Sequence, residues 1–192
     1  ADKKSSKQSY ALVLETFVII GSSILVLVVV ALDILKVIFI GDPEYWQAMY
    51  IVPIILLANF CLGIYQNLSV WYKVTDMTKF AAYISVVGAT ITLLLNIILI
   101  PNYSFLGSAV ATLIAYLTMA LLSYSIGKKY YPIPYNASKI LFYILLSISL
   151  SSISFYGFRD NILVGIACIM VMNLVILVKE KRQIIKLFNL IR

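Results

Sequence analysis

Long apolar runs alternate with short polar segments along the whole chain. A membrane-spanning helix needs roughly 20 mostly apolar residues. Six runs come near this length, although the fifth is shorter and rich in serine; they cover residues 10–32, 45–70, 80–100, 105–126, 140–156 and 161–178. Proline marks two of the breaks, at Pro43 and Pro101, because it cannot continue a helix. The pattern predicts an all-α integral membrane protein with about six transmembrane helices.

Composition agrees with a membrane environment. Of the 192 residues, 62% are hydrophobic, and the mean hydropathy is +1.01. A soluble domain of this size could not bury so much hydrocarbon. The segment "DILKVIFIGDPEY" after the first run stays apolar, with isolated charges. It is either an interfacial helix or the last turns of a long, tilted first helix.

The positions of the basic residues predict the orientation. The net charge is +7, and all but two of the 15 Lys and Arg residues lie before the first run, between the second and third, between the fourth and fifth, or after the sixth. The exceptions are Lys36 and Arg159. Short loops rich in Lys and Arg stay in the cytoplasm, so both ends of the chain are expected there. Orientation explains the charge, and membrane lipids rather than nucleic acid are the expected surroundings.

Amide and hydroxyl side chains form polar stripes on two of the predicted helices. Residues three or four apart share a helix face. One stripe runs through Ala81, Ser85, Gly88, Thr92 and Asn96, and the other combines Asn59, Gly63, Gln66 and Val70, with Asn67 adjacent. Such residues either hydrogen-bond across helices or line a solute route. The candidates for a substrate pathway are Asn59, Gln66, Asn67, Thr92 and Asn96.

Three further positions stand out on the predicted helices. Gly107, Ala111 and Ala115 form a small-residue ridge of the kind that lets two helix backbones approach closely. Glu15 is an acid well inside an apolar run, which makes it a candidate for ion coupling, although it lies near enough to the boundary to reach interfacial water. Pro53 is expected to kink the second helix.

The chain lacks the residues that most catalytic chemistry requires. The sequence has no histidine and no G-x-x-x-x-G-K-[ST] motif, which removes imidazole-based acid–base catalysis and a P-loop. Cys61 and Cys168 both fall within apolar runs, without a spacing that suggests a metal site or a disulfide framework. The sequence therefore predicts neither an enzyme nor a bound metal or other cofactor.

The hairpin-like segment "ITLLLNIILIPNYSFLGSAVATLIAY" resembles the C-terminal half of bacterial polysaccharide and O-antigen flippases, members of the multidrug/oligosaccharidyl-lipid/polysaccharide exporter superfamily. The shared pattern is an asparagine before an apolar run, then I-P, a short turn, and G-A-A followed by A-T. The upstream "GIYQN" and the Thr78-Lys79 pair fit as well, so that the resemblance covers roughly residues 34–135. The family turn usually carries glycine where this chain has Ser104, and alanine where it has Ser108.

The resemblance implies a protein of two helical lobes around a central cavity. Residues 10–135 would be a four-helix portion of the C-terminal lobe, and residues 136–180 two additional membrane helices. Residues 1–9 would be a cytoplasmic basic loop, and residues 181–192 a basic cytoplasmic tail. The chain begins without methionine or a signal-peptide pattern, and a piece of a longer protein, lacking its N-terminal lobe, is expected.

The activity implied by the resemblance is transport. The cargo would be an undecaprenyl-pyrophosphate-linked oligosaccharide, flipped across the bacterial cytoplasmic membrane by alternating access for surface polysaccharide synthesis. Such an anionic cargo calls for basic residues deep in the membrane, which this chain lacks and the missing lobe would supply. Two alternatives stay open: drug or metabolite efflux by the same fold, and a non-transporting scaffold that partners other membrane proteins of glycan assembly.

Overall fold

The computed structural model describes residues 3–40, 42–159 and 161–191. Within these ranges it describes only the backbone of residues 3, 4, 43 and 182–191. Every regular element in these ranges is helical. In chain order the elements are α1 (Lys3–Phe39), the 3-10 helix η1 (Pro43–Ile51), α2 (Val52–Leu68), α3 (Val70–Val74), α4 (Lys79–Tyr130), α5 (Ala137–Ser152), the π-helix η2 (Ile153–Gly157) and α6 (Ile162–Ile191).

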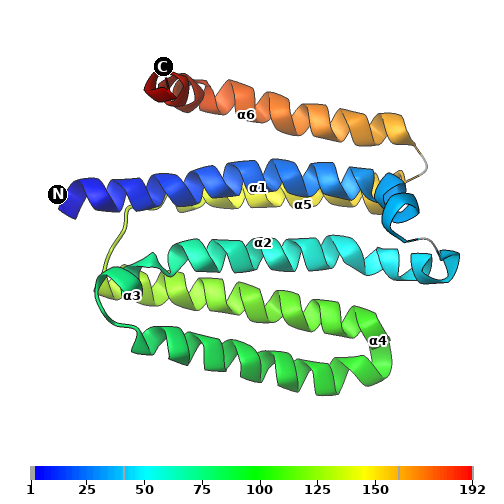
Figure 1. Cartoon of the computed structure of the whole chain (residues 1–192), viewed down its shortest axis with the longest axis horizontal. Coiled ribbons are helices and arrows are strands. Elements are labelled where there is room, and N and C mark those ends of the chain that lie inside the picture. The colour runs from blue at the N-terminus through cyan, green and yellow to red at the C-terminus, as the bar shows by residue number, and fades with distance from the viewer. Residues whose placement is uncertain (1–2, 41, 160, 192) are drawn as a thin grey trace.

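Five helical segments in the described ranges are long and apolar enough to cross a membrane. They are Ser5–Phe39, Glu44–Val74, Lys79–Tyr130, Ala137–Gly157 and Ile162–Lys181. They lie side by side, and the start of α1, α3 and the end of α6 share one end of the bundle (Figure 1). The chain is thus an all-helical protein compatible with several membrane crossings.

The 52-residue α4 is a hairpin of two helical arms. Ser104 interrupts it with φ 49° and ψ −131°, and the chain turns back there (Figure 1). The arms touch, because a Cβ on Gly88 would lie 2.4 Å from the Met119 sulfur. A straight helix of this length would extend about 78 Å, more than twice the roughly 30 Å hydrocarbon thickness. The two apolar runs predicted here therefore occupy one arm each, with the turn just after the expected proline break.

Ser104 adopts a backbone conformation that favours glycine. A non-glycine residue in such a sparsely populated region costs about 1–3 kcal/mol. The Ser104→Gly variant should therefore raise the free energy of unfolding by about 1 kcal/mol, measured by thermal unfolding in detergent. Ser85→Gly, at an exposed helical position of the same hairpin, should instead lower stability slightly. A Ser104→Gly protein that unfolds at a lower temperature than the parent would contradict the strained turn.

Several helix boundaries differ from the sequence-based expectation. The chain is helical from Lys3, so the predicted 1–9 loop is wrong for its described part; residues 1 and 2 lie outside the described residues. The helix continues to Phe39, which makes "DILKVIF" the end of a long first helix. Pro53 lies in the first turn of α2, where 3-10 geometry gives way to α-helix, and this position tolerates proline without a kink. The predicted basic tail, 181–192, continues α6 as far as Ile191.

α1 connects the two halves of the bundle. It contacts α2 on one side and α5 and α6 on the other, while α2 packs against the α4 hairpin. At the end where α3 lies, Trp71 joins α3 to the second arm of α4. Its side chain is buried, its Nε1 donates to the Ser123 carbonyl oxygen at 3.1 Å, and its ring stacks on Tyr130. Such an aromatic contact, with its polar atom satisfied, anchors helices near a membrane–water boundary.

Candidate functional site

The predicted polar residues of α2 lie on a face that the described residues leave open. Asn59 and Gln66 are exposed, and Asn67 is half-buried. The side-chain amides of Asn59 and Asn67 donate to the carbonyl oxygens one turn earlier, each at 2.9 Å. Gln66 and Asn67 also line a shallow hollow of about 180 Å³ between α1 and α2, which Tyr10 and Lys73 border. The three amides therefore share one accessible region.

The predicted polar residues of α4 lie in its first arm. The Thr92 hydroxyl donates to the Gly88 carbonyl oxygen at 3.0 Å. The Oδ1 atom of Asn96 is buried and has no hydrogen-bond partner among the described residues. The contacts of Gly88 with Met119 and of Gly107 with Leu99 set the register of the two arms. No hydrogen bond between described residues joins Thr92 or Asn96 to the amides of α2.

The small-residue ridge lies inside the α4 hairpin. Gly107, Ala111 and Ala115 are all buried. A Cβ on Gly107 would lie 2.6 Å from the carbonyl oxygen of Leu99 in the opposite arm. At this position the backbones of the two arms are in direct contact, and only glycine fits without moving one of them.

Glu15 belongs to a charge cluster contributed by three helices. Lys139 of α5 donates to the Glu15 carboxylate at 3.2 Å and to that of Glu180 in α6 at 2.8 Å. The buried Tyr143 hydroxyl donates to the other Glu180 oxygen at 3.0 Å. The exposed fractions of the charged side chains are 19% for Lys139, 13% for Glu15 and 8% for Glu180. We refer to Glu15, Lys139, Tyr143 and Glu180 as the carboxylate–lysine cluster.

The carboxylate–lysine cluster changes the role expected for Glu15. An unpaired carboxylate inside a membrane is costly and marks a functional site, but this one has a cationic partner. An open hollow of about 620 Å³ between α5 and α6 borders Lys139 and Glu180, which gives the cluster a route to water. The arrangement joins α1 to α5 and α6 through paired charges, and a role of Glu15 in ion coupling stays a prediction.

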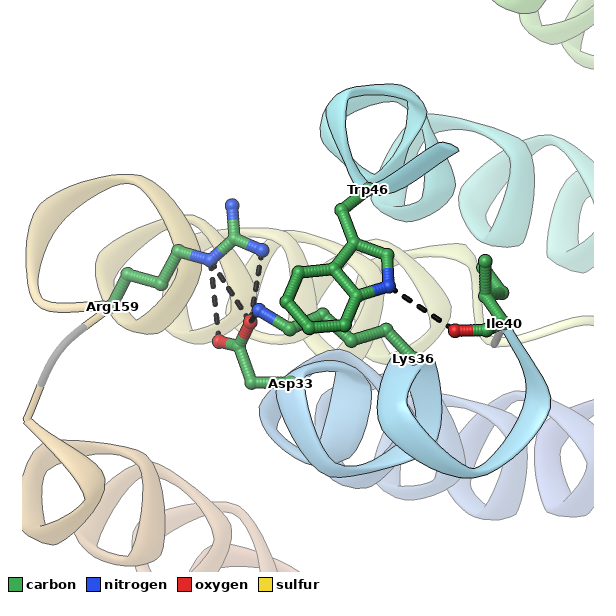
Figure 2. A network of polar contacts seen from close by, with 5 residues as sticks. All are labelled: Asp33, Lys36, Ile40, Trp46 and Arg159. Atoms are coloured by element: carbon green, nitrogen blue, oxygen red, sulfur yellow. Dashed lines mark hydrogen bonds and ion pairs between the residues drawn. The ribbon is translucent and has the colours of Figure 1, made fainter. Parts of the chain in front are cut away.

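A second charge cluster lies at the opposite end of α1 (Figure 2). Arg159, in the connection before α6, donates to both carboxylate oxygens of Asp33, with Nη2–Oδ1 at 2.9 Å. Lys36 pairs with the same carboxylate and lies over the Trp46 ring, whose Nε1 donates to the Ile40 carbonyl oxygen at 3.2 Å. We refer to Asp33, Lys36, Trp46 and Arg159 as the arginine cluster. It joins α1, η1 and the α5–α6 connection.

The two clusters are separated along α1 by the distance expected between two membrane surfaces. Glu15 and Asp33 are 18 residues apart, or about 27 Å at the helical rise per residue. Sequence reasoning singled out Glu15 but treated Lys139 as a loop residue and left out Glu180 and Tyr143. Lys139 and Glu180 lie at the ends of apolar runs, where charged residues are common. Nothing in the sequence around either residue therefore indicates that the two side chains form a pair.

The described part of the chain contains no group of three His, Cys, Asp or Glu side chains arranged to hold a metal ion. Cys61 and Cys168 are buried and not joined by a disulfide. The site therefore offers a set of neutral hydrogen-bonding groups on α2 and α4, together with two charge clusters on α1. No protein-family model, curated protein or solved structure matches the chain.

Proposed function

We propose that this chain is the C-terminal part of a transporter, a four-helix portion of one lobe with two additional helices, that flips a lipid-linked oligosaccharide across the bacterial cytoplasmic membrane. The observation that supports this most is the exposed polar face of α2. Asn59 and Gln66 are both exposed on it, and Gln66 lines the hollow beside Tyr10 of α1. A polar side chain facing hydrocarbon is costly, whereas one facing a hydrated cavity is not.

The chemistry of a sugar headgroup suits this face. Asn59 and Gln66 are seven residues apart, about 10 Å along the helix, so that one cargo of several sugar units would reach both. Amide groups offer neutral donors and acceptors to hydroxyl groups, without the cost of a buried charge. The remaining wall of the cavity would come from the N-terminal lobe, which would also supply cationic groups for the pyrophosphate.

The arrangement of the helices is consistent with the proposed topology. If the α4 hairpin makes two crossings, the chain would cross six times and both of its ends would lie on the same side of the membrane. The basic segments around Lys73, Lys128 and Lys179 would then lie on the cytoplasmic side. The identity of the cargo rests on the flippase-like pattern around Asn96 and Pro101.

Replacing the polar pathway residues by leucine tests this proposal. In the host cell, Gln66→Leu and Asn96→Leu should each lower surface glycan about tenfold, the effect of roughly 1.4 kcal/mol, at unchanged protein abundance. The matched control is Asn173→Leu, which should leave export intact, because this exposed amide of α6 already has a partner in the Ser23 hydroxyl of α1, at 3.2 Å.

Three results would overturn the flippase proposal. Full export by both variants would show that the amides only hold helices together. Unchanged glycan with increased sensitivity to drugs would favour efflux, and loss of glycan together with loss of a partner enzyme would favour the scaffold.

A further inference from the structure

An apolar groove opens on the side of the bundle, where α2, the second arm of α4 and α5 meet. It has a volume of about 310 Å³, and its wall includes Leu68, Leu117, Leu121, Ala137, Ile140 and Ile144. Leu117 and Leu121 are about half exposed, at 46% and 58%, so the groove can be entered from the side. Hydrocarbon chains of surrounding lipids are the natural contents of such a surface in a membrane.

A pocket with a more polar wall continues the apolar groove at the end where α3 lies. The pocket has a volume of about 280 Å³ and shares Leu68, Tyr124 and Tyr135 with the groove. Its wall adds Trp71 and Lys128. The segment "YPIPY" at 131–135 closes it, and two prolines stiffen this connection. Groove and pocket together have an apolar body and a polar end, as a lipid molecule has.

The Tyr135 side chain lines both the groove and the pocket. Its hydroxyl oxygen is buried and has no hydrogen-bond partner among the described residues. Burial raises the pKa of Tyr135 to about 12, so the group remains a hydrogen-bond donor at physiological pH. An unsatisfied buried hydroxyl costs about 1–3 kcal/mol, and an acceptor bound in the pocket would remove this cost.

The charges around the pocket favour an anionic acceptor. Lys128 lines it, and Lys7 lies over the ring of Tyr131, 4.1 Å from the centroid. Its wall contains no Asp or Glu. The volume of about 280 Å³ accommodates a phosphate with its glycerol, whereas an oligosaccharide would have to extend outside it.

We propose that this groove and pocket bind one anionic phospholipid, with an acyl chain in the apolar groove and its phosphate between Tyr135 and Lys128. The site is separate from the polar face of α2 and does not depend on the cargo proposed above. Its occupant would hold the α4 hairpin against α5, two elements that pack against each other little in the described part of the chain.

Tryptophan fluorescence gives a direct test. The chain has two tryptophans, and Trp46→Phe leaves Trp71, beside the pocket, as the sole reporter. The purified protein would be placed in phosphatidylcholine nanodiscs containing a small fraction of lipid with brominated acyl chains, which quench tryptophan at short range. Brominated phosphatidylglycerol should quench more strongly than brominated phosphatidylcholine at the same mole fraction.

Two matched lysine variants separate the site from general surface charge. Lys128→Gln should weaken binding of the brominated phosphatidylglycerol roughly tenfold, as expected for loss of an interaction with a charged group. Lys129→Gln removes the same charge one residue away, outside the pocket wall, and should change it little. Equal quenching by both lipids, or equal effects of both variants, would overturn the proposal.

Tyr135→Phe provides a further test, because the results expected for lipid binding are opposite to those expected if the Tyr135 hydroxyl had a purely structural role. In phosphatidylcholine alone the variant should be as stable as the parent or more so, because an unsatisfied hydroxyl is removed. Stabilisation by added phosphatidylglycerol should be lost. Ala137→Phe, which fills the groove, should abolish the preference, while Ala82→Phe on an exposed face of α4 should keep it. Unchanged lipid preference in both Tyr135→Phe and Ala137→Phe would exclude the site.

Discussion

Replacing Lys139 by methionine should lower the free energy of unfolding by about 2–3 kcal/mol, which lies between the cost for a surface pair and that for a fully buried one. Lys139 lies between the carboxylates of Glu15 and Glu180, at 3.2 and 2.8 Å. Without it, two acids from different helices would face each other in a largely buried region. Thermal unfolding of the purified protein and its abundance in the membrane measure the loss.

Two further variants serve as controls for the Lys139 experiment. Lys129→Met removes a lysine from the exposed end of α4. This change should lower the free energy of unfolding by about 1 kcal/mol or less, as is typical of surface ion pairs. Glu15→Gln combined with Lys139→Met should be less harmful than the sum of the two changes, because the residues share one interaction. A Lys139→Met protein as stable as its parent would mean that the cluster does not form.

Replacing Gly107 by valine should destabilise the protein by about 3 kcal/mol, at the upper end of typical overpacking costs. A Cβ at this position would lie 2.6 Å from the Leu99 carbonyl oxygen and 2.7 Å from its carbon. Both are backbone atoms, so the arms of the α4 hairpin would have to separate. The midpoint of thermal unfolding in detergent is the measurement.

Other glycines supply graded controls for Gly107. A Cβ on Gly88 would meet the Met119 side chain, which is flexible and can move, so Gly88→Ala should cost less than Gly107→Ala. Gly157 has no atom within 4 Å of such a Cβ, and Gly157→Ala should be close to neutral. If Gly107→Val and Gly157→Ala unfold at the same temperature, the close contact between the arms is absent.

The helices could be predicted from the sequence, because the pattern of apolar residues along the chain is sufficient to locate them. The runs ending near Ile100 and beginning near Phe105 each became one arm of α4, and the turn is at Ser104. The end of α1 was ambiguous, because Asp33 and Lys36 resemble interfacial charges until Arg159 is placed beside them. The proline at position 53 indicated a kink only because the preceding segment was taken as α-helix rather than 3-10 helix.

The candidate site was less predictable, because the residues that form it are far apart along the chain. Glu15, Lys139 and Glu180 come from three helices, and their pairing depends on how α5 and α6 pack against α1. Helical spacing placed Asn59 and Gln66 on one face, but it could not show that the face is exposed. The buried, unpartnered oxygen of Asn96 likewise depends on the register of the two arms.

The two charge clusters on α1 have a mechanical consequence. One holds α1 to α5 and α6 near Glu15, and the other holds it to the α5–α6 connection near Asp33. Fastened at both ends, these three helices should move as a single lever. Bending between this lever and the α2–α4 unit would then be confined to the two segments that connect them, which are the 3-10 segment η1 and the 131–136 connection. Spin labels on α1 and α6 should keep one distance through the proposed transport cycle, while labels on α1 and α4 should report two.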